Sequence, residues 1–257
     1  MLRCPICKKE LIHENRRFYC MNNHSFDQAK QGYVNLSLKQ KVNQGDNKEM
    51  VQARTAFLEK DIYDFMRQSV IALLKEYQID TLVDLGCGQG YYTSAFQKVC
   101  SKVVGVDLSK DALIYASKQN KAIQYVVASI YDLPLMDACC HGVTSLFVGD
   151  ADQEIHRILK KDGLWITVSP GPKHCWELKE LLYQNVLENL LPSNQKEGFD
   201  LISEQVCQSK KYIDDLWPLL EMTPYRYKSP KEGLEKVRNS QGKEITFEFI
   251  IRCFRKK

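Results

Sequence analysis

Four residues near the N-terminus have the types and the spacing of a metal site: Cys4, Cys7, Cys20 and His24. Two cysteines with two residues between them can point their sulfurs at one place from a tight turn. A Cys–His pair that follows after a spacer of twelve residues can complete a tetrahedron around the same place. The pattern predicts a structural zinc site with three thiolates and one imidazole, and incidental buried cysteines are the alternative. A segment this small has too little core to fold alone, so the metal would stabilise it.

Three glycines form a second group with a chemical role. Gly86, Gly88 and Gly90 follow the short apolar stretch 81–85 and precede residues 91–99, which have helical periodicity. A strand, a glycine turn and a helix in this order bind nucleotide cofactors in doubly wound α/β sheets. A dinucleotide fingerprint needs glycines spaced one and then two residues apart, whereas here the spacing is one and one. No Gly-Lys-Ser/Thr follows, so a P-loop is excluded as well.

Two carboxylates indicate which cofactor such a turn would bind. Asp84 lies just before the turn, which is awkward beside a pyrophosphate but natural beside a sulfonium ligand that carries an amino group. Asp107 ends the next apolar stretch, and an acid at that strand tip accepts hydrogen bonds from ribose hydroxyls. The pattern favours S-adenosylmethionine over NAD. Helix capping, or a surface acid at a strand end, is the alternative for both residues.

A sheet is needed to position these residues, and the chain alternates between strands and helices as such a sheet requires. We expect a doubly wound, Rossmann-like α/β fold with a parallel sheet. Ser129 follows the third strand of this sheet and would lie beside the adenine. The predicted strands are 11–12, 17–19, 81–85, 102–107, 123–128, 142–148, 164–168 and 245–254. The predicted helices are 47–60, 62–76, 91–99, 151–161, 176–191 and 214–222, with a loop over 192–199.

Composition and charge limit the class of protein. The 257 residues are 44% hydrophobic and 26% charged, which is ordinary for a globular protein and excludes wholesale disorder. No apolar stretch approaches the roughly 20 residues of a spanning helix, and the first residues contain no apolar signal region, so we expect a cytoplasmic protein. Residues 1–41 carry eight Lys/Arg against three Asp/Glu, and residues 207–257 carry twelve against seven. Basic ends suit an enzyme that meets a polyanion, although a solvated surface with chance asymmetry explains them equally well.

Longer motifs add a family resemblance that covers nearly the whole chain. The zinc pattern continues into Ser25-Phe26-Asp27 and is followed by Gly32-Tyr-Val-Asn-Leu36 and, much later, by Pro170-Gly-Pro-Lys-His174. Shorter matches lie at 45–46, 48–50, 53–54 and 57–58, and the turn motif 84–93 is common to very many methyltransferases. Together these segments resemble the bacterial 23S rRNA guanine-N1 methyltransferases of the RlmA/TlrB type.

The resemblance implies a fold, a site and a reaction. S-adenosylmethionine would touch Tyr63, Gly88, Gln89, Asp107 and His174, beside the rest of the glycine turn, and zinc would sit on the four N-terminal ligands. The product would be N1-methylguanine at position 745 or 748, in a hairpin loop of the helix 35 region of 23S rRNA. We expect a homodimer that encloses an RNA cleft. Residues 1–38 would form a zinc-binding RNA-recognition domain, and residues 39–257 the methyltransferase domain.

One segment departs from the family pattern. Relatives carry a Tyr-Ala-Pro-Cys-like segment after the fourth strand, where this chain has Phe147-Val148-Gly149-Asp150. Asp150 is placed near the carboxyl end of the sheet and is a candidate base for the N1 proton, although an exposed loop aspartate is an equally good interpretation. Two rival functions fit the same motifs. They are a small-molecule or protein methyltransferase with a structural zinc ribbon, and a non-catalytic RNA-binding module.

Overall fold

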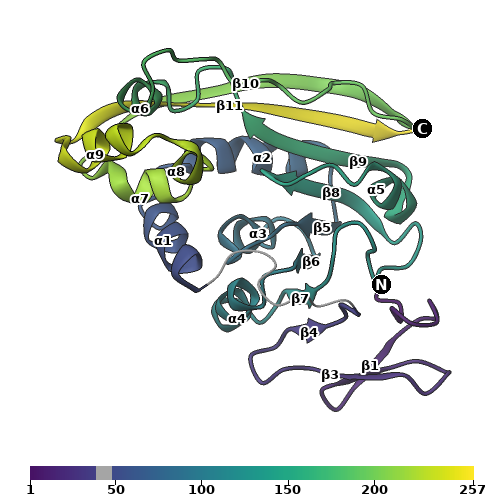
Figure 1. Ribbon diagram of the computed structural model, residues 1–257. Coiled ribbons are helices and arrows are strands. Elements are labelled where there is room, and N and C mark those ends of the chain that lie inside the picture. Colours follow the sequence, from purple (N-terminus) through teal and green to yellow (C-terminus); the bar gives the residue numbers. More distant parts are fainter. Residues whose placement is uncertain (39–47) are drawn as a thin grey trace.

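The computed structural model describes residues 1–38 and 48–257, which form a large sheet, helices packed against it and a small ribbon (Figure 1). The strand order in the large sheet is β10-β11-β9-β8-β5-β6-β7-β4. Its strands are β4 (Val34–Asn35), β5 (Thr81–Leu85), β6 (Lys102–Asp107), β7 (Gln124–Val127), β8 (Cys140–Leu146), β9 (Leu159–Pro170), β10 (Phe199–Ile213) and β11 (Lys243–Lys256).

Parallel pairing dominates the sheet. Strands β4 to β9 pair parallel with one another, and β11 and β10 extend the β9 edge in antiparallel pairing. The carboxyl ends of β5, β6, β7 and β8 therefore lie along one edge, where ligands bind in folds of this kind. The doubly wound, Rossmann-like α/β fold expected from the sequence is confirmed.

The six helices predicted from the sequence are present, with some different ends. They are α1 (Lys48–Leu58), α2 (Asp64–Glu76), α3 (Tyr91–Phe96), α5 (Asp152–Ile158), α6 (Trp176–Leu182) and α7 (Leu216–Glu221). The described residues form further helices that were not predicted, which are α4 (Lys110–Gln119), α8 (Tyr225–Lys228) and α9 (Lys231–Asn239). Residue 47, where the first helix was expected to begin, and the motif segment 45–46 lie outside the described residues. Within the described ranges, no helix combines the length and the apolar character needed to cross a membrane.

Several predicted helices end earlier than expected, and the helix expected over 91–99, for example, ends at Phe96. The helix expected over 176–191 ends at Leu182, because Tyr183 adopts an extended conformation. The Lys179 ammonium then donates hydrogen bonds to the Leu187 carbonyl and to the Asn189 side chain, which holds the following chain against α6. The helix expected over 151–161 ends at Ile158, where the chain enters β9 and pairs with β8.

The two faces of the sheet bury different partners. Leu82 of β5 lies in a core cluster with residues of α1 to α4, such as Phe57. The next residue, Val83, points to the opposite face, because side chains alternate along a strand. There it shares a second cluster with Ile155 of α5 and with Phe18 of the N-terminal ribbon.

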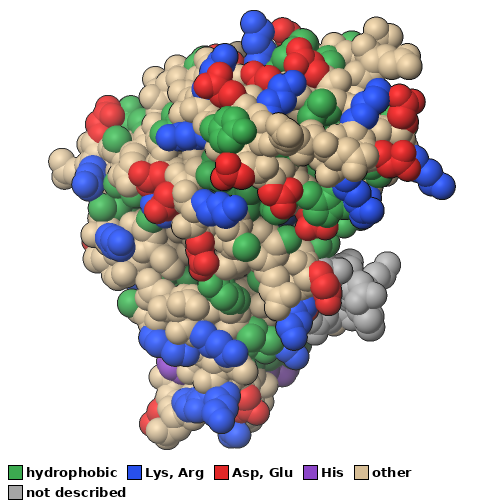
Figure 2. Space-filling model, turned by 90° about the vertical axis from the view of Figure 1, so that its left-hand side faces the viewer, with side chains coloured by type: hydrophobic (Ala, Val, Ile, Leu, Met, Phe, Trp, Pro, Cys, Tyr) green, Lys and Arg blue, Asp and Glu red, His purple; other side chains and the backbone are tan. Residues whose placement is uncertain are grey.

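The ribbon is a three-stranded antiparallel sheet of β1 (Ile12–Glu14), β2 (Arg17–Tyr19) and β3 (Ser25–Asp27). Two of these strands were predicted from the sequence and the third was not. The chain before the ribbon forms a bridge between Leu2 and Leu135, in the loop after β7, and the chain after the ribbon enters the large sheet through the parallel pairing of β4 with β7. Figure 2 shows it as the narrow lower end of the molecule, with Lys and Arg side chains gathered across it and just above it.

Candidate active site and metal centre

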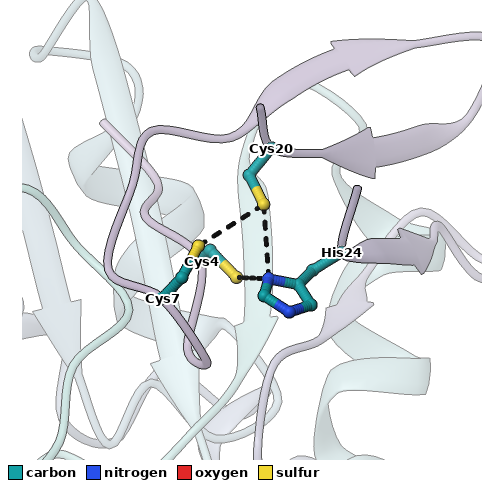
Figure 3. A group of neighbouring side chains, drawn as sticks. All are labelled: Cys4, Cys7, Cys20 and His24. Atoms are coloured by element: carbon teal, nitrogen blue, oxygen red, sulfur yellow. Dashed lines mark hydrogen bonds between the residues drawn. The ribbon is translucent and has the colours of Figure 1, made fainter. Parts of the chain in front are cut away.

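The four predicted metal ligands converge on one point in the ribbon (Figure 3). Their ligand atoms all lie within 4.8 Å of one another. The His24 Nδ1 atom lies 3.5 Å from the sulfurs of both Cys4 and Cys20, and the Cys7 and Cys20 sulfurs are 3.5 Å apart. Two tight turns bring the pairs together, since the Lys8 N–H donates to the Cys4 carbonyl and the Asn23 N–H donates to the Cys20 carbonyl.

This donor set fits zinc. Three sulfurs and one imidazole nitrogen are the ligands of many structural zinc sites, and Zn–S bonds of about 2.3 Å place tetrahedral ligands roughly 3.5 to 4 Å apart. The backbone N–H of Lys9 lowers the pKa of the Cys7 thiol to about 6, which favours the thiolate that a metal binds. All four positions are filled by protein atoms, so the metal would hold the ribbon together rather than bind a substrate.

The glycine turn lies at the carboxyl end of β5. Gly86, Gly88 and Gly90 all have positive φ, of 65°, 53° and 83°, which a residue with a side chain rarely adopts. The turn is held against β6, because the N–H groups of Gly86 and Cys87 both donate to the Val106 carbonyl. A Cβ atom added to Gly88 would meet nothing within 4 Å, so this glycine borders open space.

Asp107 fixes the turn from the end of β6. Its carboxylate accepts hydrogen bonds from the Gly88 N–H at 2.8 Å and from the Ser109 N–H at 2.7 Å. The carboxylate lies at the carboxyl end of β6, where the sequence predicts that it accepts hydrogen bonds from ribose hydroxyls. Next to it, the Gln89 side chain is only 7% exposed, and its Nε2 atom has no hydrogen-bond partner in the described chain. Open space at Gly88 and a buried amide without a partner fit a bound nucleoside such as that of S-adenosylmethionine.

Asp84 lies beneath the turn rather than facing this open space. It is 2% exposed, and its two carboxylate oxygens accept hydrogen bonds from the Thr93 hydroxyl at 2.6 Å and from the Thr144 hydroxyl at 2.7 Å. Burial raises its pKa to about 6, and the two hydroxyls oppose that shift. Asp84 therefore joins β5 to α3 and β8. The sequence analysis missed both threonines, whose only signal is a polar residue at a buried position.

Tyr63 and His174 meet in an aromatic cluster. Their ring centroids are 6.3 Å apart, and both rings also contact Phe247 and Phe249. Both side chains are nearly inaccessible, at 5% and 6% exposure. Burial lowers the pKa of His174 to about 4, so the imidazole is neutral at physiological pH. The predicted contact of these two residues with the cofactor stays a prediction.

The last two predicted site residues lie at the same edge of the sheet. Ser129 follows β7, and its hydroxyl accepts a hydrogen bond from the Tyr131 N–H at 3.2 Å. Asp150 follows β8, and its carboxylate pairs with the Lys196 ammonium, which lies 5.4 Å from the centre of the Trp165 ring. The ion pair offers no support for Asp150 as a base, so that role also stays a prediction.

The fold and these two sites define a class I S-adenosylmethionine-dependent methyltransferase with an N-terminal zinc ribbon. Comparison with known proteins agrees with this class. A family model described as "RlmA, N-terminal" matches residues 2–41, and a model described as "Methyltransferase domain" matches residues 83–167.

Similar whole proteins narrow the class to one family. The 23S rRNA (guanine(748)-N(1))-methyltransferase of Streptomyces fradiae is 31% identical over 188 residues, which cover 70% of this chain and 67% of that protein. A Micromonospora griseorubida protein, provisionally named a 23S rRNA (guanine-N(1)-)-methyltransferase, is 31% identical over 70% of this chain and 69% of its own length. Bacillus subtilis YxjB, provisionally named in the same way, is 27% identical over 98% of this chain and 95% of its own length. The chain belongs to the family of 23S rRNA (guanine-N1)-methyltransferases.

Proposed function

We propose that this chain transfers a methyl group from S-adenosylmethionine to N1 of a guanine in a hairpin loop of 23S rRNA. The observation that carries the proposal is the match with Bacillus subtilis YxjB over 98% of this chain, which includes both the ribbon and the methyltransferase sheet. A small-molecule methyltransferase has no need of a basic ribbon at the edge of its sheet. An RNA substrate therefore explains both the ribbon and the methyltransferase sheet, whereas a small-molecule or protein substrate explains only the sheet.

The chemistry needs alignment more than a strong base or an acid. S-adenosylmethionine supplies a methyl group on a positively charged sulfur, which is already a good electrophile. Gly88 and Asp107 would hold the nucleoside, and Gln89 would complete its polar contacts, so that the cofactor is fixed before the base arrives. The aromatic wall of Tyr63 and His174 would exclude water from one side.

The acceptor must be an accessible guanine. N1 lies on the Watson–Crick edge, so the target guanine is unpaired in a loop or turned out of the stack. Neutral guanine carries a proton on N1, which a protein group or water must accept during transfer. Asp150 remains the candidate from the sequence, and its ion pair with Lys196 would have to open first.

Three further properties follow from the same proposal. Residues 1–38 would act as the RNA-recognition domain and residues 39–257 as the methyltransferase domain. The active form would be a homodimer that encloses the RNA, which sedimentation of the pure protein tests directly. The enzyme would work in the cytoplasm, where ribosomal RNA is made and folded.

Methyl transfer to unmodified 23S rRNA tests the function. Incubation with radiolabelled S-adenosylmethionine should label one guanine, and the modified base should stop reverse transcription at a single position. Label on another base, or on protein or small molecules alone, would contradict the proposal. Calorimetry with S-adenosylmethionine separates the remaining rival, because a non-catalytic RNA-binding module would give no heat of binding.

A further inference from the structure

The segment that follows β8 lies directly over the glycine turn. A Cβ atom on Gly86 would lie 2.9 Å from the Val148 Cβ atom, which is closer than real Cβ contacts allow. Glycine at this position therefore permits residues 147–149 to pass across the turn. Gly86 and Gly88 belong to the same turn, so residues 147–149 lie near the open space beside Gly88.

Phe147 begins this segment in a strained conformation. Its φ is 60°, and a bulky residue in the left-handed region costs about 1 to 3 kcal/mol. The strain is imposed by the sheet, because the Phe147 N–H still donates to the Val168 carbonyl of β9 at 3.0 Å. Phe147 is nevertheless 43% exposed, so a large part of the ring is not used for packing.

The strained backbone directs the ring to a defined place. The ring centroid lies 5.4 Å from that of Phe249 and 6.3 Å from that of Tyr92, so the ring packs against other aromatic side chains. Tyr92 belongs to α3, which begins at the glycine turn. An aromatic ring that packs against other rings and is still partly exposed is suited to stack on a planar group.

We propose that Phe147 is the stacking platform for the acceptor base, with the purine ring of the target guanine lying on its exposed part. The inference rests on the proposed function and names the residue that holds the substrate in place. Stacking of a base on an aromatic ring is worth about 1 to 3 kcal/mol and does not need hydrogen bonds to the base. The ring would hold the guanine at the edge of the sheet while N1 faces the methyl donor.

Replacement of Phe147 by glycine gives a sharp test, because glycine removes the ring and also relieves the backbone strain. We expect F147G to unfold at about the same temperature as the wild type, because the relieved backbone strain offsets the lost contacts of the ring. Its affinity for S-adenosylmethionine should stay within about twofold, whereas kcat/KM for the rRNA hairpin should fall roughly tenfold to a hundredfold. Phe147→Trp, which keeps a stacking ring, should retain most of the activity.

A fluorescent base reports the contact itself. With 2-aminopurine in place of the target guanine, the bound hairpin should be quenched by the wild type and by F147W, and brighter with F147G. Tyr212→Ala is the matched control, because Tyr212 is an exposed aromatic residue on the distant edge strand β10 and should change neither readout.

Two results would overturn the proposal. One is wild-type hairpin kinetics and fluorescence in F147G. The other is an equal loss of cofactor affinity and thermal stability in F147G, which would make the ring a packing element. If the wild-type enzyme methylates no guanine, the proposed function itself is wrong. If it methylates a guanine and F147G does so equally well, only the stacking role of Phe147 is wrong.

Discussion

At the scale of single residues, Asp84 has the clearest expected effect. Asp84→Ala leaves the hydroxyls of Thr93 and Thr144 buried without their acceptor, and each such group costs about 1 to 3 kcal/mol. We expect a lower melting temperature and a loss of S-adenosylmethionine affinity of about tenfold or more, both measurable by calorimetry. Thr144→Val is the control, since it leaves the bond to Thr93 and should have a smaller effect. Unchanged cofactor affinity in D84A would contradict the positioning role.

A second residue controls how stability depends on pH. Burial lowers the pKa of His174 to about 4 in the folded protein, whereas the unfolded chain titrates near 6.5. Between these values only the unfolded chain binds the proton, so the contribution of His174 is fully present above pH 6.5 and is lost as the pH falls toward 4. The loss amounts to about 3 kcal/mol at most. The contribution of Asp84 to folding stability changes with pH in the opposite direction. Its pKa is raised in the folded protein, so acidification favours the folded state.

His174→Phe should therefore make the protein less sensitive to acid. Phenylalanine keeps a ring in the aromatic cluster and has no proton to bind, but it loses the buried hydrogen bond between His174 Nδ1 and the Glu248 backbone. Urea unfolding at pH 7 and near pH 4.5 measures the difference for the wild type and for H174F. The free energy of unfolding should fall less between the two pH values in H174F than in the wild type. Parallel pH profiles would show that His174 does not carry this dependence.

Single residues also show which features of the site could be predicted from the sequence and which could not. The four metal ligands could be predicted, because their spacing within 21 residues already determines that they can meet. The acceptor bonds of Asp84 could not, because Thr144 is 60 residues away and reaches Asp84 only through the pairing of β5 with β8. The strain at Phe147 leaves no trace in the sequence at all, since it arises from the hydrogen bond to β9.

At the scale of elements, the ribbon strands depend on their metal. Cys20→Ser removes one of four ligands, and we expect the variant to release zinc to a colorimetric chelator. Hairpin affinity should then fall about tenfold or more, while S-adenosylmethionine affinity stays within about twofold, because the predicted cofactor residues all lie outside the ribbon. Cys207→Ser is the matched control, since this free cysteine lies outside the cluster. Equal losses of both affinities would contradict a ribbon that is specific for RNA.

Elements differ in how well the sequence predicts them, for a physical reason. Strands β5 and β6 are buried along nearly all of their length and appear as short apolar runs. Strand β10 pairs only with β11, and most of its side chains are at least partly exposed, so its sequence resembles a loop. Strand β4 has two residues and exists because it pairs with β7, which lies far along the chain. The local sequence pattern therefore predicts buried strands. The formation of an edge strand depends on pairing with its neighbour, which the local pattern does not show.

At the scale of the whole molecule, the ribbon covers part of the sheet. Leu2, Leu11 and Phe18 share a core cluster with Leu133 and Leu135 of the methyltransferase body. A division of the chain at residue 38 therefore separates two parts that are joined by buried apolar side chains. RNA bound to the ribbon would be held at a defined distance from the cofactor, because the two parts share a core.

The charge distribution of the whole chain leads to the last prediction. Both ends carry an excess of Lys and Arg, and the ribbon presents part of that excess at the narrow end of the molecule (Figure 2). Each neutralised phosphate contributes a slope of about −0.7 to −0.9 in log affinity against log salt. If the protein contacts three or more phosphates, a rise from about 50 to 200 mM salt should weaken hairpin binding tenfold or more. Filter binding at a series of salt concentrations measures this change. Hairpin binding that ignores salt would contradict recognition through these basic ends and would favour a small-molecule substrate.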